Sequence, residues 1–208
     1  MAGFVAAVAG RDDPVWVGID PGVSGALAFV CGDRFCAVDV PQAVRRVRRR
    51  RRLSPARAKA AGRKTRTVAV TEREADLGAV AALFRLLEPL GGRLRFALER
   101  VPPTVGRPGR AYAEVRLNRA YAMWPLFLAY LGHPVVGVSP ADWKRTFGLR
   151  RSDKDASRAA AARLFPGADV ARKKDHNRAE ALLLAEYLRR HWPAAARPSD
   201  ENGGKDIV

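Results

Sequence analysis

The sequence contains little that would build a secreted or membrane-spanning protein. Only two of its 208 residues are cysteine, Cys31 and Cys36. They are too few for a disulfide framework and lack the companions of a zinc site. No apolar run approaches the ~20 residues that a membrane-spanning helix needs. Residues 1–10 are apolar, but they have no basic start and are short for a signal peptide. We therefore expect a cytoplasmic or organellar protein with no membrane segment.

Acidic residues are scarce relative to basic ones. The chain has 21 Asp or Glu against 38 Lys or Arg, which gives a net charge of +17 at pH 7. Twelve of the basic residues, and no acid, fall within residues 41–67. Because like charges repel in so dense a run, we expect this segment to be mobile without a partner. The excess indicates a polyanion, nucleic acid rather than membrane since no amphipathic anchor helix accompanies it. A solubilising linker is the alternative interpretation.

The order of strands and helices predicts an α/β fold. With 48% hydrophobic residues, the chain can build one ordinary core. Apolar alternation and turn residues predict strands over 15–30 (two strands), 34–40, 94–98 and 134–138. Helical spacing and capping boxes predict helices over 71–87, 112–131, 152–165 and 175–191. Strands joined by helices in this order favour a mixed sheet with helices on its faces.

One domain is expected, over residues 14–192, with the Arg-rich run 41–67 as an insertion. Residues 1–13 and 193–208 are expected to be flexible tails. Within the domain, the apolar strand from Val15 ends in one carboxylate, Asp20, followed by Pro21 and Gly22. A charged acid at the tip of an apolar strand is costly unless a cation meets it.

Two further acids could join Asp20. Glu99 repeats its arrangement, because it follows an apolar strand and precedes a loop rich in Pro and Gly. Functional strand ends of an α/β sheet lie along one edge, so the two acids could share a cation, although a pair of surface acids is the alternative. Glu180 falls on the otherwise apolar face of the last helix with Leu183 and Leu184. Buried carboxylates are rare unless paired or bound to metal.

The start of the last helix offers a fourth acid, with two interpretations. Asp175 is either another ligand or simply the N-cap of the helix. By helical spacing, His176 and Asn177 rather than Asp175 lie four and three residues before Glu180. Three or four carboxylates on a sheet edge suit Mg²⁺ or Mn²⁺. Two such ions would activate water and stabilise the leaving oxygen of a phosphodiester, which with basic loops indicates a nuclease.

Several of these segments resemble one family, the RuvC-type Holliday junction resolvases of the RNase H-like superfamily, and most of all its plant chloroplast branch, the monokaryotic chloroplast resolvases. The matching segments, in order, are Gly18–Gly22, Glu99, Val138–Phe147, Asp153–Arg158 with Leu164–Pro166, and Lys173–Leu183. The similarity covers roughly residues 15–190. Each motif alone is weak, but their order and spacing together are specific.

The resemblance implies an RNase H-like fold, with a three-strand antiparallel meander plus parallel strands, and a homodimer that nicks a four-way DNA junction symmetrically with Mg²⁺ or Mn²⁺. It implies that Asp20, Glu99, Asp175 and Glu180 bind the metal, with His176 as a substitute ligand. Lys144 and Lys154 would lie near the scissile phosphate or the DNA backbone. The full set of expected DNA-binding residues is Arg100, Arg110, Tyr112, Lys144, Arg145, Lys154, Lys173, Lys174 and Arg178.

The chain departs from the family at three points. Bacterial members place their last two acids three residues apart, and here the earlier position is Asn177; the plant-like spacing supports Asp175. No aromatic residue follows Glu99 directly, so Tyr112 is the nearest candidate to enter the junction, unless it belongs to the core. The run 41–67 is longer than the corresponding connection in plant members. A bacterial, phage or organellar origin would each fit.

Three other functions compete with the resolvase. A non-catalytic nucleic-acid-binding module with the same fold predicts that one acid is missing or turned away. Another RNase H-like nuclease would act on RNA hybrids or transposon ends. An actin-like or sugar-kinase ATPase also ends its first strand in Asp, but it needs two such halves and a much longer chain.

Overall fold

The computed structural model describes residues 1–22, 24–101, 111–150 and 154–195. Its strands are β1 (Val15–Asp20), β2 (Ala26–Cys31), β3 (Arg34–Asp39), β4 (Gln42–Arg52), β5 (Thr65–Ala75), β6 (Leu94–Glu99) and β7 (Val135–Val138). Its α-helices are α1 (Ala2–Val8), α2 (Pro55–Ala61), α3 (Leu77–Arg85), α4 (Ala111–Tyr130), α5 (Pro140–Thr146), α6 (Lys154–Leu164) and α7 (His176–Ala195). Two 3₁₀ helices are η1 (Glu88–Arg93) and η2 (Lys173–Asp175). None of the described helices is long and apolar enough to cross a membrane.

The main sheet has five strands in the order β3-β2-β1-β6-β7. The strands β1, β2 and β3 form an antiparallel meander, whereas β6 pairs parallel with β1 and β7 pairs parallel with β6. The predicted α/β fold, a mixed sheet with an antiparallel meander and parallel strands, is thereby confirmed. A three-strand antiparallel meander beside parallel strands is the sheet that the resemblance implied.

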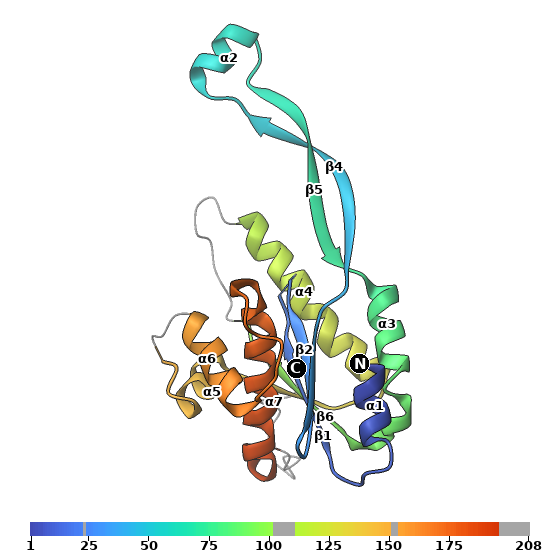
Figure 1. Ribbon diagram of the computed structural model, residues 1–208. Helices are drawn as coiled ribbons and strands as arrows, with labels where there is room; N and C mark the ends of the chain where they lie inside the picture. The colour runs from blue at the N-terminus through green and yellow to red at the C-terminus, as the bar shows by residue number, and fades with distance from the viewer. Residues whose placement is uncertain (23, 102–110, 151–153, 196–208) are drawn as a thin grey trace, which may run out of the picture.

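Helices cover both faces of this sheet, as predicted (Figure 1). Because side chains alternate along a strand, Val15, Val17 and Ile19 enter one core with α1, α3 and α4. Trp16 enters the second core, which α5, α6 and α7 close on the opposite face. The central strand is therefore buried on both sides, and its end is held in place by two layers of helix.

Three local expectations differ from the structure. Residues 2–8 form α1 rather than a loose tail, because Phe4, Val5 and Val8 bury their side chains in the first core. The capping box predicted at residues 71–74 is wrong. Those residues continue β5, and α3 begins only after Asp76, whose side chain accepts a hydrogen bond from Ala79 N at 3.0 Å. α7 continues to residue 195, and the rest of the predicted C-terminal tail lies outside the described residues.

The Arg-rich run is not a loose segment either. It forms β4 and, with β5, an antiparallel hairpin of eleven paired positions from Gln42 with Ala75 to Arg52 with Thr65. Figure 1 shows the hairpin projecting from the body, with α2 at its tip. Ladder hydrogen bonds and the Val and Thr residues of β5 favour a strand, and the acids Glu72 and Glu74 relieve part of the repulsion.

Candidate active site

Asp20 and Glu99 leave the sheet side by side. β1 and β6 are parallel, and Ile19 lies opposite Leu98. The next residue of each strand is the acid, and neighbouring strands lie about 4.8 Å apart. The register therefore brings the two predicted acids to the same edge, which is what their repeated pattern in the sequence indicated.

The turn after β1 fixes the backbone around Asp20. Gly22 N donates to Asp20 Oδ1 at 3.2 Å, and Gly25 N donates to Gly22 O at 2.8 Å. A Cβ atom at Gly25 would come within 2.0 Å of Asp20 O, so only glycine allows the chain to return this closely. The carboxylate is thus held at the strand end rather than free to swing into solvent.

Helix α7 brings the third acid from far along the chain. A Cβ atom at Gly18 would lie 2.1 Å from Ala181 O and 2.6 Å from Ala185 N, so the helix backbone lies directly on β1 at this glycine. Ala181 follows Glu180, and Gly18 precedes Asp20 by two residues. This close approach places Glu180 at the edge where Asp20 and Glu99 emerge, as its place on the apolar face predicted.

The three carboxylates act on one another electrostatically. Burial, and then the negative charges of Asp20 and Glu180, raise the pKa of Glu99 to about 7. The indole N–H of Trp143 and the ammonium of Lys144 oppose this rise. Lys144 Nζ lies 3.9 Å from Glu180 Oε1, which also accepts from Ser157 Oγ at 3.4 Å. The charge of Lys144 therefore opposes the rise in the pKa of Glu99 without cancelling it.

This donor set fits a hard divalent cation. Carboxylate oxygens are the ligands that Mg²⁺ and Mn²⁺ prefer, and a cation would relieve the repulsion among Asp20, Glu99 and Glu180. As placed in the described residues, no three His, Cys, Asp or Glu side chains are already gathered tightly enough to hold an ion. Like charges keep such carboxylates apart, so binding requires them to draw together.

Asp175 is not brought into this group. Its side chain is 2% exposed and accepts from Arg172 Nε and Nη2, each at 2.9 Å. Asp175 Oδ2 also accepts from Arg172 N at 2.9 Å, which completes a capping box around η2. The hydrogen bonds from Arg172 lower the pKa of Asp175. Asp175 is therefore neither gathered with the other acids nor the N-cap of α7: the N-cap is Arg172, and Asp175 is the third residue of η2, reaching back to it.

The two residues after Asp175 make local contacts. His176 Nδ1 lies 3.2 Å from Lys173 O, within the same turn. Asn177 donates through Nδ2 to Ser24 O and so ties the start of α7 to the turn after β1. Asn177, at the position of the earlier bacterial acid, therefore supports the loop around Asp20.

The predicted DNA-binding residues fall into different surroundings. Lys144 belongs to the acid edge. Arg145 is exposed and pairs with Asp142 at 2.7 Å. Lys173 and Lys174 are exposed on η2, where either a solvated or a phosphate-binding role is compatible with their position. Arg100 donates its backbone N–H to Val138 O at 2.8 Å, and its side chain lies across Gly137.

Arg178 has a different environment from the one expected. Its guanidinium donates to both carboxylate oxygens of Asp39 at 2.7 Å and also pairs with Asp169. Hydrogen bonding to Asp39 raises its pKa further, and its side chain is only 17% exposed. Arg178 thus joins the start of α7 to the end of β3 and has little surface left for DNA. Three other predicted positions lack described side chains: Arg110 lies outside the described residues, and Tyr112 and Lys154 lie in the first turns of α4 and α6.

The hairpin carries a second basic region, and its two faces differ. Alternate residues of β4 share a face with their partners on β5. One face, here called the arginine face, presents the exposed side chains of Arg46, Arg48, Arg50, Arg52 and Arg73. Between residues 42 and 75, all of which are described, the only acids, Glu72 and Glu74, lie on the other face.

That other face, here called the glutamate face, is partly neutralised and partly apolar. Glu72 pairs with Arg49, and Glu74 lies 3.5 Å from Arg45, while Val47, Val68 and Val70 are half-buried among them. At the base, Arg116 Nη2 of α4 donates to Arg73 O at 2.6 Å. The hairpin is therefore anchored to the body and directs unpaired arginine charge to one side.

Two residues near the acids had no role in the sequence-based prediction. Trp143 Nε1 donates to Glu99 Oε1 at 3.1 Å, and Ser157 reaches Glu180. Ser157 is 2% exposed and lies on the buried face of α6, with Ala160 and Ala161 three and four residues later. A serine on such an alanine face is a signal that could have identified it.

Comparison with known proteins gives one relative by sequence and a weak structural likeness. The chain is 36% identical over 113 residues to the chloroplastic Holliday junction resolvase MOC1 of Chlamydomonas reinhardtii. That match covers 51% of this chain but only 13% of the relative. No protein-family model matches the chain.

Among solved structures, RuvC of Thermus thermophilus aligns with a TM-score of 0.44 and 16% identity, and its complex with a Holliday junction substrate with 0.46 and 15%. Each alignment covers 86% of this chain and 96% of the other. Likeness at this level carries no conclusion about activity. The sequence match confirms the resemblance that the motifs indicated: over half its length, the chain is similar to a resolvase of the chloroplast branch.

Proposed function

We propose that this chain is a metal-dependent endonuclease that resolves four-way DNA junctions by symmetric nicking. The observation that carries the proposal is that Asp20, Glu99 and Glu180, from three separate elements, lie along one edge of the sheet, near enough for the charges of the other two to raise the pKa of Glu99. A partly buried carboxylate whose pKa is raised by neighbouring acids costs stability when it is charged, and such groups are typical of functional sites.

In this proposal Asp20, Glu99 and Glu180 hold Mg²⁺ or Mn²⁺. When bound there, the ions would supply activation of water and stabilisation of the leaving oxygen. Lys144, 3.9 Å from Glu180, balances the charge of the edge and can contact the phosphate that enters it. Asp175, the fourth predicted ligand, joins the set only if its ion pair with Arg172 opens.

The DNA would be held through its phosphates. Exposed Lys173 and Lys174 flank the start of α7, and the arginine face extends the basic surface along the hairpin. Alternate strand residues are about 6.8 Å apart, so neighbouring arginines of this face can each contact a separate phosphate of one DNA strand. Because two strands must be cut at symmetric positions, we propose that two copies of the chain act as a homodimer.

The sequence relative supports the same substrate. Its printed name assigns Holliday junction resolution and a chloroplast location to that protein. The chain spans about an eighth of that relative's length. Junction resolution and the chloroplast location are therefore proposals for this chain. We propose that the protein acts in an organelle if its origin is organellar. If its origin is bacterial or phage, we propose that it acts in the bacterial cytoplasm.

A non-catalytic module is the main alternative, since it would keep the fold and the basic surface. It predicts that one acid is missing or turned away. Asp20, Glu99 and Glu180 are all present at one edge, which supports the nuclease, but in the described residues they are not gathered tightly enough to hold an ion, so the nuclease requires them to draw together on cation binding. Another RNase H-like nuclease would use the same three acids on a different substrate, such as an RNA hybrid or a transposon end. The two functions differ only in which nucleic acid the protein cuts.

The test is cleavage of a mobile four-way junction in Mg²⁺, with linear duplex of the same sequence and an RNA–DNA hybrid as competing substrates. We expect paired nicks in the junction alone, and loss of cutting in Asp20→Asn. Asp33→Asn, which removes an exposed aspartate at the β2–β3 turn, is the matched control and should cut normally. Equal cutting of duplex, or cutting that survives Asp20→Asn, would refute the proposal.

A further inference from the structure

Trp143 places a buried hydrogen-bond donor on one of the acids. Its side chain is 0% exposed, and its indole Nε1 donates to Glu99 Oε1 at 3.1 Å. Tryptophan can only donate, and when buried it needs an acceptor. The contact joins α5 to the end of β6, 44 residues earlier in the chain, so it depends on the fold rather than on local sequence.

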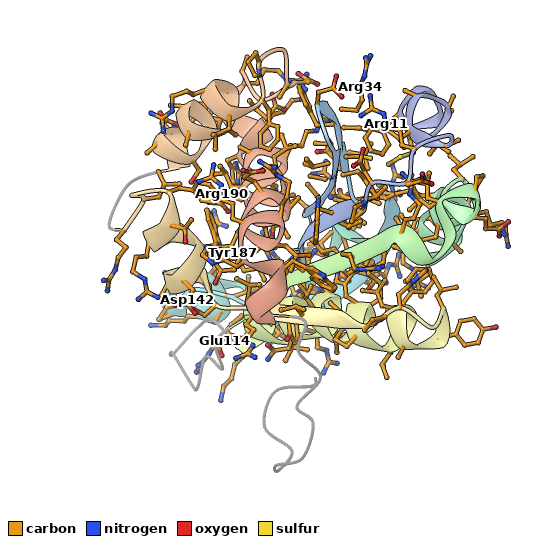
Figure 2. The ribbon with its side chains drawn as sticks, turned by 90° about the horizontal axis from the view of Figure 1, so that it is seen from below. Arg11, Arg34, Glu114, Asp142, Tyr187 and Arg190 are labelled. Carbon is orange, nitrogen blue, oxygen red and sulfur yellow. The ribbon has the colours of Figure 1, made fainter. Side chains whose placement is uncertain are left out.

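Helix α5 is held firmly enough to fix this donor. Ser139 accepts from Asp142 N at 3.2 Å as the N-cap. At the other end, the guanidinium of Arg190 lies 5.1 Å from the centre of the Phe147 ring. Figure 2 shows Tyr187 and Arg190 of α7 on the side of that helix where Asp142 of α5 also lies. Trp143 therefore approaches Glu99 from a helix fastened to α7.

The next residue extends the same arrangement to a second acid. Lys144 Nζ lies 5.1 Å from the centre of the Trp143 ring and 3.9 Å from Glu180 Oε1. Two consecutive residues of one short helix thus contact the acids of β6 and α7. Lys144 places a positive charge beside Glu180, whereas the neutral indole of Trp143 donates a hydrogen bond that orients the carboxylate of Glu99.

We infer that Trp143 is a positioning residue for Glu99. Its N–H binds Oε1 and fixes the rotation of the carboxylate that would hold the cation. This rests on the proposed metal site. An outer hydrogen bond of this kind orients a ligand before the ion arrives, and losing one typically weakens metal binding by about 10- to 100-fold.

The hydrogen bond itself can be tested without metal. The chain has four tryptophans, so the ¹H–¹⁵N spectrum of the whole protein should show four indole N–H signals, and Trp143→Phe identifies one of them. Glu99→Gln should shift that signal and leave those of Trp16, Trp124 and Trp192 in place. A Trp143 signal that is insensitive to Glu99→Gln would overturn the inference.

Calorimetric titration with Mn²⁺ tests the consequence. We expect Trp143→Phe to weaken Mn²⁺ binding at least about tenfold. Trp124→Phe is the matched control, because Trp124 is equally buried but lies in the core on the opposite face of the sheet. It should lose stability and keep its Mn²⁺ affinity. Equal Mn²⁺ affinity in Trp143→Phe and wild type would refute the inference alone, whereas a wild type that binds no Mn²⁺ would refute the proposed function as well.

Discussion

Replacing Glu99 with glutamine should make the metal-free protein more stable at alkaline pH. The carboxylate is partly buried beside Asp20 and Glu180, and its pKa is raised from 4.5 to about 7. Glutamine keeps the shape and an oxygen that can accept from Trp143, but it carries no charge. Removal of the charge therefore removes a repulsion without opening a cavity.

The sign of the effect follows from proton linkage. Below pH 4.5 the carboxyl is protonated in both folded and unfolded chains and contributes no difference. Between pH 4.5 and about 7 the folded chain holds a proton that the unfolded chain releases, so stability falls as pH rises. Above that window the full shift corresponds to about 3 kcal/mol, and partial solvent contact reduces it to about 2 kcal/mol.

Urea unfolding in EDTA at pH 5 and pH 8.5 measures the difference. Glu99→Gln should match wild type within about 0.5 kcal/mol at pH 5 and exceed it by about 2 kcal/mol at pH 8.5. Adding Mg²⁺ at pH 8.5 should stabilise wild type and leave the variant unchanged, because the variant has lost a ligand.

A second buried glutamate serves as the control with the opposite sign. Burial alone would raise the pKa of Glu186, but hydrogen bonds from Arg189 and Arg190, all at 2.7–2.8 Å, lower it. Its charge therefore stabilises the fold above pH 4.5, and this contribution is lost as pH falls through the lowered pKa. Glu186→Gln should destabilise at pH 8.5. Destabilisation by Glu99→Gln at pH 8.5, or an equal gain at both pH values, would show that the acid edge is not strained.

Further predictions concern the hairpin, the close approach of α7 and the cap. Changing Arg46, Arg48 and Arg50 together to glutamine should weaken junction binding at least about tenfold and reduce the slope of log affinity against log salt by about 2–3. The matched triple on the glutamate face, Arg45, Arg49 and Arg51, should do much less in the same titration. Gly18→Ala should destabilise by at least about 2 kcal/mol in urea, because its Cβ would meet the backbone of α7; wild-type stability would contradict the placement of Glu180. Asp175→Ala should cost about 2 kcal/mol and Asp175→Asn less, since the asparagine side-chain oxygen can still accept from Arg172 N; equal losses would indicate that the ion pair with Arg172 dominates.

The sheet and two of its acids could be predicted because they depend on local patterns. The alternation of apolar residues predicted the strands. Asp20 is the last residue of one predicted strand, and Glu99 follows another. The position of Glu180 followed from helical spacing on an apolar face. Glu180 can lie close to β1 because Gly18 has no side chain to hold α7 away. A glycine in a predicted strand does not reveal which segment of backbone packs against it.

The hairpin and the ion pairs of Asp175 and Arg178 could not be predicted, for a different reason. Residues 71–74 match a capping box, but pairing with β4 satisfies their backbone groups in a strand, so a long-range ladder overrides a local signal. Asp175 and Arg178 show the same limit. Their partners include Arg172 nearby and Asp39 from β3, 139 residues away from Arg178, and the sequence does not show that contact.

The separation of the two charged regions explains why the acids remain strained. An arginine placed against Glu99 would form an ion pair, lower its pKa and compete with a cation for its oxygens. The chain instead carries its densest positive charge on a hairpin anchored through α4, and it sets one lysine, Lys144, beside Glu180. The repulsion at the edge is sustained because Asp20 and Glu99 end central, paired strands and Glu180 belongs to a helix fixed at Gly18. A cation at Glu99 would relieve the repulsion that raises its pKa, so replacing Glu99 should weaken metal binding and raise metal-free stability at alkaline pH.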